Sequence, residues 1–350
     1  MEPAADLLSR PPEEGARLIA LSYLDQAAAA FPRLQDASDT EALHDFRVGL
    51  RRLRSCLRSY GPYLEESLPK KLRRRLRDLA RSTGPGRDTE VQIEWLRGRS
   101  RHLSSYRRAG LAWILARLEE RMREANEDMA KRLPREFPKV EKNLRERLST
   151  YRTEVHLAAG THASPTLAEV TAGILREQAS ELEAHLARVE SPEDETEAHE
   201  ARISAKRLRY LLEPFTGELP GAAPLVKRIK GLLDLLGELH DAHVLETELA
   251  GALQIASAER VRRLLDISLS GAPDEALLRA ERRRVLESGL LALAKLNRAR
   301  RNRLFDDLES DWLEGRAEGF LREVEGVFPP DPSTPAPESV PRRSPSPIPS

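Results

Sequence analysis

Two short stretches of this chain carry the same pattern of cationic side chains. Residues 44–54 read HDFRVGLRRLR, and residues 199–209 read HEARISAKRLR. Each stretch begins with a histidine and has cations three, seven, eight and ten positions later. Guanidinium and ammonium groups bind phosphate oxygens, and the planar guanidinium fork holds two of them at once. A row of such groups is therefore suited to an anion that carries many phosphates.

The spacing of these cations matches one face of an α-helix. At about 100° per residue, His44, Arg47, Arg51, Arg54 and Arg58 fall within one narrow arc, and the apolar residues fall roughly opposite. The second stretch has the same two faces. Each stretch therefore predicts an amphipathic helix whose apolar stripe packs inward. A solvated helix face usually mixes signs because like charges one turn apart repel, so two matching cationic stripes indicate a polyanion as partner.

The likeness between the two stretches continues downstream. A basic segment follows each stretch, and a corner with a glycine and an aspartate comes next, Gly84 and Asp88 in the first copy and Gly237 and Asp241 in the second. Aligning the aspartates sets three cations of one basic segment opposite three of the other. These cations are Arg74, Arg75 and Arg77, opposite Lys227, Arg228 and Lys230. The chain is therefore predicted to contain an internal repeat.

The repeated motif, with its glycine and aspartate corner, resembles the CHAD family, the conserved histidine α-helical domain. The resemblance covers roughly residues 10–325. It implies an all-α fold of two tandem antiparallel helical bundles related by pseudo-twofold symmetry, at residues 10–157 and 165–326. It also implies a basic groove, formed where the two repeats meet, that binds inorganic polyphosphate. Family members can associate with polyphosphate granules, so the resemblance extends the expected location to such granules.

The residues expected to bind polyphosphate are the two histidines that open the motifs and the cations that follow them. In the first repeat these are His44, Arg47, Arg51, Arg52, Arg54, Arg74, Arg75 and Arg77. In the second repeat they are His199, Arg202, Lys206, Arg207, Arg209, Lys227, Arg228 and Lys230. Polyphosphate is flexible, carries about one charge per phosphate and has no bases, so its recognition depends on spaced cations and on counterion release.

Three roles compete for His44 and His199: donation to phosphate, metal coordination, and a structural hydrogen bond to a backbone carbonyl. Metal coordination needs companions such as His240 and His243, which are three residues apart and match no common zinc motif. The sequence therefore predicts no metal site and no cofactor, and it leaves the other two roles open.

Two other function classes also need a cationic surface. One is a nucleic-acid-binding protein, but aromatic residues make up only 5% of the chain and offer few stacking platforms for bases. The other is a metal-dependent phosphohydrolase, but the sequence has no P-loop, no GxSxG motif and no pair of acids beside the cationic stripes. We therefore expect a polyphosphate-binding protein that is not an enzyme.

The charge of the chain is balanced in total and polarised along its length. It has 57 Lys and Arg and 57 Asp and Glu, yet residues 44–81 carry 12 cations and 4 acids. Overall neutrality is therefore compatible with an anionic ligand. Cys56 is the single cysteine, which fits a reducing cytoplasm, and no apolar run reaches the length of a membrane span. We expect a cytoplasmic protein that does not bind a membrane.

Helical patterns fill almost the whole chain between turn signals rich in glycine and proline. The expected helices are 13–35, 41–60, 69–81, 88–99, 107–132, 136–150, 166–189, 195–213, 223–236, 241–269, 274–295 and 297–325. Pro134 and Gly237 mark two of the expected breaks. Residues 158–165 are expected to link the repeats, and residues 329–350, with 9 prolines in 22 positions, to be disordered.

Overall fold

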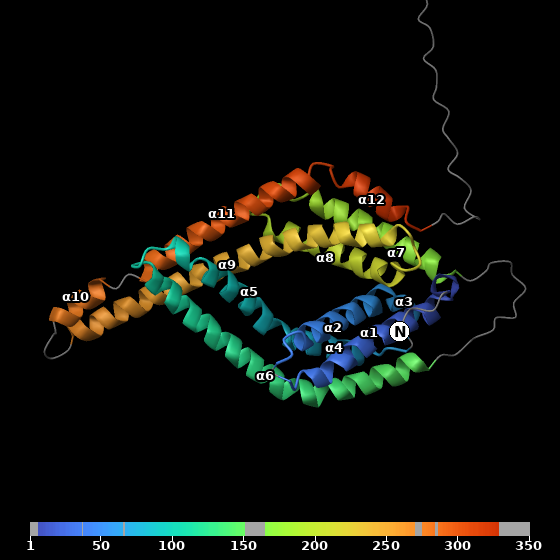
Figure 1. The fold of residues 1–350 in the computed structure, drawn as a ribbon, viewed down its shortest axis with the longest axis horizontal. Helices are drawn as coiled ribbons and strands as arrows, with labels where there is room; N and C mark the ends of the chain where they lie inside the picture. The colour runs from blue at the N-terminus through green and yellow to red at the C-terminus, as the bar shows by residue number, and fades with distance from the viewer. Residues whose placement is uncertain are drawn as a thin grey trace, which may run out of the picture.

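Helices build the fold in the computed structural model of this chain (Figure 1). The structure describes residues 6–36, 38–65, 67–150, 165–269, 275–283 and 286–328. Within these ranges every regular element is helical, so the predicted all-α fold is confirmed. None of the helices found there stays apolar over enough length to cross a lipid bilayer. The expected linker, apart from Pro165, and the proline-rich tail lie outside the described residues.

The helices follow the two predicted repeats in chain order. The first repeat contains α1 (Pro12–Arg33), α2 (Ala42–Ser59), α3 (Gly61–Leu64), α4 (Lys70–Ser82), α5 (Gly84–Gly98) and α6 (Arg108–Ser149). The second contains α7 (Leu167–Leu186), α8 (Glu195–Leu212), α9 (Ala222–Ser268), α10 (Glu275–Arg283), α11 (Leu286–Trp312) and α12 (Glu318–Glu325). Short 3-10 turns lie at Leu7–Ser9, Ser100–His102 and Glu213–Phe215.

The first cationic motif lies on α2, and the second lies on α8. The apolar side of α2 is buried, and Phe46, Leu50 and Leu53 are each at most 1% exposed. Helix α1 packs closely against α2, since a Cβ at Gly49 would lie 2.8 Å from the backbone nitrogen of Ala27. This packing leaves the cationic side of α2 next to α4 and α8, both of which contact α2.

Two hydrophobic cores hold the helices together, and each draws residues from both predicted repeats. The larger core includes Phe46 of α2 and Leu208 of α8. The smaller core includes Leu118 of α6 and Leu249 of α9, toward the left of Figure 1. Because the two repeats bury apolar surface in the same cores, each repeat fixes the position of the other. The pseudo-twofold relation between them stays a prediction.

The expected break at Pro134 is wrong, because α6 continues through Pro134 and Pro138. A proline inside a helix removes one backbone hydrogen bond and bends the helix without always ending it. Figure 1 shows α6 changing direction along its length. Leu133 and Phe137 are buried beside the two prolines, and their packing stabilises the helical conformation there.

Two expected breaks in the second repeat are also wrong. Helix α9 runs through Gly237, where a Cβ would meet Nε of Arg202 at 3.8 Å, an ordinary contact distance. Helix α11 runs through Asn297, which is buried and donates from its side chain to the carbonyl oxygen of Ala242 at 2.7 Å. A tertiary hydrogen bond therefore holds Asn297 inside its helix, whereas a single glycine is tolerated inside α9.

Candidate functional site

A cavity of about 850 Å³ lies between α2, α4 and α8. We call it the cationic groove, because the charged residues of its described lining are nine cations and one acid, Glu65. The cations are Arg51, Arg54, Arg58, Lys70, Arg73, Arg74, Arg77, Lys206 and Arg207. Both predicted repeats contribute, since α2 and α4 belong to the first and α8 to the second.

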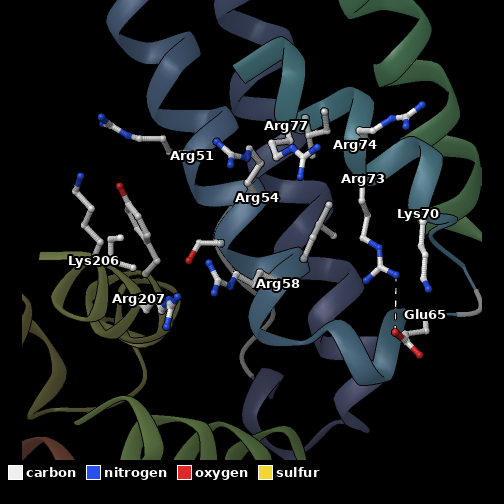
Figure 2. A pocket seen from close by; sticks show the side chains of 15 residues that line it. Arg51, Arg54, Arg58, Glu65, Lys70, Arg73, Arg74, Arg77, Lys206 and Arg207 are labelled. Carbon is white, nitrogen blue, oxygen red and sulfur yellow. Dashed lines mark ion pairs between the residues drawn. The ribbon is translucent and has the colours of Figure 1, made fainter. Parts of the chain in front are cut away.

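The helical repeat explains how so many cations reach one cavity. Arg51, Arg54 and Arg58 follow each other at intervals of three and four on α2, so they share one face of the helix. The lining cations of α4 follow the same intervals. Figure 2 shows Arg51 and Arg58 reaching toward Lys206 and Arg207 on α8. Helix α8 is therefore one wall of a single groove, and α2 and α4 form the opposite wall.

Most of these cations have no carboxylate partner. In the part of the chain that the structure describes, Arg51, Arg54, Arg58, Lys70, Arg74 and Lys206 form no ion pair. Burial lowers the pKa of Arg54, and the charges of Arg81 and Arg77 lower it further. Burial likewise lowers the pKa of Arg58, and the charge of Arg207 adds to this effect. The groove is therefore a region of uncompensated positive charge, and an anion would relieve its repulsion.

Lys206 has the most strongly shifted pKa among the groove cations. Burial lowers the pKa of Lys206 to about 7, and the positive charges of Arg202, Arg51 and Arg209 contribute after burial. Asp241 opposes the shift but does not cancel it. Near neutral pH, a large share of the unliganded protein therefore carries Lys206 as a neutral amine.

Several of the cations predicted to bind polyphosphate are instead paired with acids. Glu213 contacts Arg52 of α2 at 2.7 Å and Arg209 of α8 at 3.0 Å. On the outer side of α9, Arg228 pairs with Glu323 of α12 at 2.8 Å. None of these three arginines is among the described residues that line the groove. Arg207 lines the groove and also pairs with Glu181 of α7, at 2.9 Å.

The two motif histidines lie in different surroundings. His44 is exposed, whereas the ring of His199 lies 5.0 Å from the ring of His240. Burial lowers the pKa of His240 to about 4, and Arg202 is the next cause, so His240 is neutral at pH 7. His243 donates from Nε2 to the carbonyl oxygen of Pro192 at 2.7 Å, which is a structural contact. Across the described ranges, no three His, Cys, Asp or Glu residues are placed to hold a metal ion.

The structure brings six of the sixteen predicted binding residues together on the groove: Arg51, Arg54, Arg74, Arg77, Lys206 and Arg207. The other ten lie outside its described lining: His44, Arg47, Arg52, Arg75, His199, Arg202, Arg209, Lys227, Arg228 and Lys230. Arg47 and Arg202 lie close to it, because the charge of Arg51 lowers the pKa of each, after burial as the main cause. That these sixteen residues bind polyphosphate stays a prediction.

Three groove cations were not among the residues predicted to bind polyphosphate, namely Arg58, Lys70 and Arg73. The prediction kept only cations of the basic segments that had a counterpart in the other repeat, and Lys70 and Arg73 have none. Helical spacing alone indicates them, since Arg58 continues the stripe of Arg54 and Lys70 lies one turn before Arg73 and Arg74.

Comparisons with known proteins identify the family and the fold. The family model for the CHAD domain matches residues 18–250, which is more than half of the chain. The crystal structure of the CHAD domain from the plant Ricinus communis is similar to this structure with a TM-score of 0.56. That likeness covers 78% of this chain and 92% of the plant chain at 23% sequence identity, so it concerns the fold. No curated protein matches the sequence. On the family match, this chain belongs to the CHAD domain family.

Proposed function

We propose that this protein binds inorganic polyphosphate in the cationic groove and does not hydrolyse it. The observation that carries the proposal is the set of nine cations around one cavity, six of them without an ion pair among the described residues. Uncompensated cations in a groove attract a polyanion and gain free energy when its bound counterions are released.

The geometry of the walls suits a linear chain of phosphates. Successive cations on α2 are separated by about one helical turn, roughly 5 Å along the axis, so each can meet a different phosphate. Arginine supplies most of them, and its fork binds two phosphate oxygens together. A long chain that is bound to one wall meets the cations of the second wall at a high effective concentration. It therefore makes more contacts than a short chain.

The lining of the groove favours polyphosphate over nucleic acid. Single-stranded nucleic acids bind by stacking bases on aromatic side chains between cations. Tyr210 is the one aromatic residue in the described lining, and it is only 9% exposed. The guanidinium of Arg209 lies over its ring at 4.8 Å. The groove therefore offers charge without a free stacking surface.

The lining also supports binding without hydrolysis. A metal-dependent phosphohydrolase holds its metal ions with several carboxylates or histidines near the scissile phosphate. The described lining contains Glu65 as its one carboxylate, and Glu65 lies 3.8 Å from Arg73. We propose that binding itself is the activity, and that it attaches the protein to polyphosphate granules.

The test is a set of titrations at several salt concentrations with long-chain polyphosphate, single-stranded DNA and RNA, each matched in total charge. We expect polyphosphate to bind most tightly and orthophosphate release to stay at background with added Mg²⁺ or Mn²⁺. Equal or tighter binding of DNA or RNA would overturn the choice of ligand. Phosphate release above background that disappears on loss of groove arginines would overturn the non-enzymatic assignment.

A further inference from the structure

Glu213 lies where the two walls of the cationic groove are joined. It directly follows α8 and opens the 3-10 turn Glu213–Phe215. One of its carboxylate oxygens is 2.7 Å from Nε of Arg52 on α2, and the other is 3.0 Å from Nε of Arg209 on α8. The side chain of Glu213 is only 14% exposed. One carboxylate thus bridges an arginine from each repeat.

Both arginines of this bridge are held in place by further contacts. Arg52 donates to the side-chain oxygen of Gln26 on α1 at 3.2 Å, and its guanidinium lies 5.9 Å from the ring centre of Tyr23. Arg209 lies over the ring of Tyr210, which lines the groove. The bridge therefore connects the packed interior of the first repeat to the wall of the second.

Within the described residues, the contact between Arg52 and Glu213 is the one ion pair that joins α2 to α8. The cations of these two helices face each other across the groove and repel, as the effects of Arg51 on Lys206 and of Arg207 on Arg58 indicate. The contact between Arg52 and Glu213 opposes this repulsion, in addition to the hydrophobic core that α2 and α8 share.

We propose that Glu213 is a positioning residue that holds α2 and α8 at the spacing at which a single phosphate chain contacts both walls. The inference rests on the proposed function of the groove. Glu213 does not touch the ligand, because its carboxylate repels phosphate and is paired with Arg52 and Arg209. It acts through the distance between the two helices.

Positioning and simple electrostatics predict opposite results for Glu213→Gln. The substitution removes a negative charge close to the groove, which by itself would tighten the binding of a polyanion. If Glu213 sets the spacing of the walls, the same substitution weakens binding, because a chain bound to one wall loses the effective concentration of the other. The sign of the change therefore separates the two explanations.

The experiment compares the affinities of the wild type and Glu213→Gln for long-chain polyphosphate and for tripolyphosphate. We expect Glu213→Gln to bind the long chain about tenfold more weakly, because it depends on both walls. We expect tripolyphosphate, whose three phosphates gain less from a second wall than a long chain does, to change by less than about twofold. Glu65→Gln is the matched control, since it removes a groove carboxylate that does not join α2 to α8, and it should bind the long chain more tightly.

Three results would overturn the inference. They are equal or tighter binding of the long chain by Glu213→Gln, equal losses for the two ligands, and additive effects of Arg52→Gln and Glu213→Gln in a double-mutant cycle. Circular dichroism and thermal unfolding confirm that each variant is folded. If Glu213→Gln does not fold, Glu213→Asp, which keeps the charge and shortens the reach, enters the same comparison. Failure of the wild type to bind polyphosphate would instead overturn the proposed function.

Discussion

The two basic helices hold their cations in different ways. On α2, Arg51 and Arg54 form no ion pair with any carboxylate of the described residues, and Arg51 is exposed. On α8, Arg207 is paired with Glu181 and Lys206 is partly buried with a lowered pKa. The difference arises because α8 packs against both α7 and α9, whereas the cationic side of α2 faces α4, which is itself cationic.

This difference shows that one sequence motif can produce two kinds of wall. The wall from α2 and α4 supplies charges that are exposed and available to an anion. The wall from α8 supplies fewer free charges, and its cations are set by neighbours, namely Glu181, Glu213 and the surrounding arginines. We therefore expect loss of cations from the first wall to weaken binding most, and changes on the second wall to alter its dependence on pH and on neighbouring acids.

The largest expected effect is the loss of two unpaired cations from α2. The double variant Arg54→Ala with Arg58→Ala should bind long-chain polyphosphate about a hundredfold more weakly, or roughly tenfold for each charged contact. The slope of log affinity against log salt should fall by about 0.7 for each lost contact, using the single-strand value as a guide. Titrations at four or more salt concentrations measure both quantities.

The matched control for this double variant removes two arginines that are not among the described residues lining the groove. Arg123 and Arg132 on α6 are exposed and pair with Glu120 and Glu136 of the same helix. Arg123→Ala with Arg132→Ala has the same change in net charge, and its salt slope should equal that of the wild type. If both double variants lose the same slope, total charge determines binding and the groove has no special part in it.

Lys206 is expected to give the second wall a dependence on pH. Its pKa is about 7 in the unliganded protein, and Arg51, Arg202 and Arg209 repel its charged form while Asp241 favours it. A bound polyanion stabilises the ammonium and raises this pKa, so binding takes up a proton above pH 7. Affinity should therefore be constant below about pH 7 and fall by up to about tenfold per pH unit above it.

Lys206→Arg tests this proton uptake, because arginine keeps its charge throughout the range. Titrations from pH 6 to pH 9 should show a falling affinity for the wild type and a nearly constant affinity for the variant. The stability of the unliganded protein should change with pH in the opposite direction to the affinity. The pKa of Lys206 is lower in the folded than in the unfolded chain, so its free energy of unfolding should rise with pH above 7. The same pH dependence in Lys206→Arg would contradict the role of Lys206.

Much of the first wall could be predicted from the sequence because helical periodicity decides which residues share a face. The stripe of Arg51 and Arg54 lies opposite the buried Phe46 and Leu50, as the pattern predicted. On α4, alignment of the two repeats predicted Arg74 and Arg77, and both line the groove. The prediction for α2 needs only the helix repeat and the rule that apolar stripes pack inward.

Pairing between distant helices could not be predicted from the same pattern. Nothing in the motif of α8 indicates that Arg209 meets a carboxylate also bound to Arg52, because that contact depends on how two repeats pack. The continuity of α9 through Gly237 could not be predicted either, because a single glycine weakens a helix without always ending it. Alignment of the repeats placed Arg228 in the site, whereas its contact with Glu323 involves α12, which has no part in the motif.

The smallest expected effect concerns Glu181, the acid that pairs with Arg207 and so competes with the ligand for it. A second cavity adjoins the cationic groove through Arg58 and Arg207, and its lining contains Glu169, Glu177 and Glu181. Arg207 therefore lies at the boundary between a cationic and an acidic cavity lining. Glu181→Gln frees the guanidinium of Arg207 and removes a repulsive charge, so it should tighten the binding of long-chain polyphosphate about threefold, the range of a partly exposed ion pair.

Glu183→Gln is the matched control for Glu181→Gln. Glu183 lies two residues further along α7, is exposed, and is not among the described residues that line either cavity. Competition titrations against labelled polyphosphate at low salt resolve a threefold change. A gain for Glu181→Gln alone supports a local release of Arg207, which Arg207→Ala should abolish when it is combined with Glu181→Gln. Equal gains for both glutamates would mean that α7 acts only through its total charge, and that Arg207 is already free to bind.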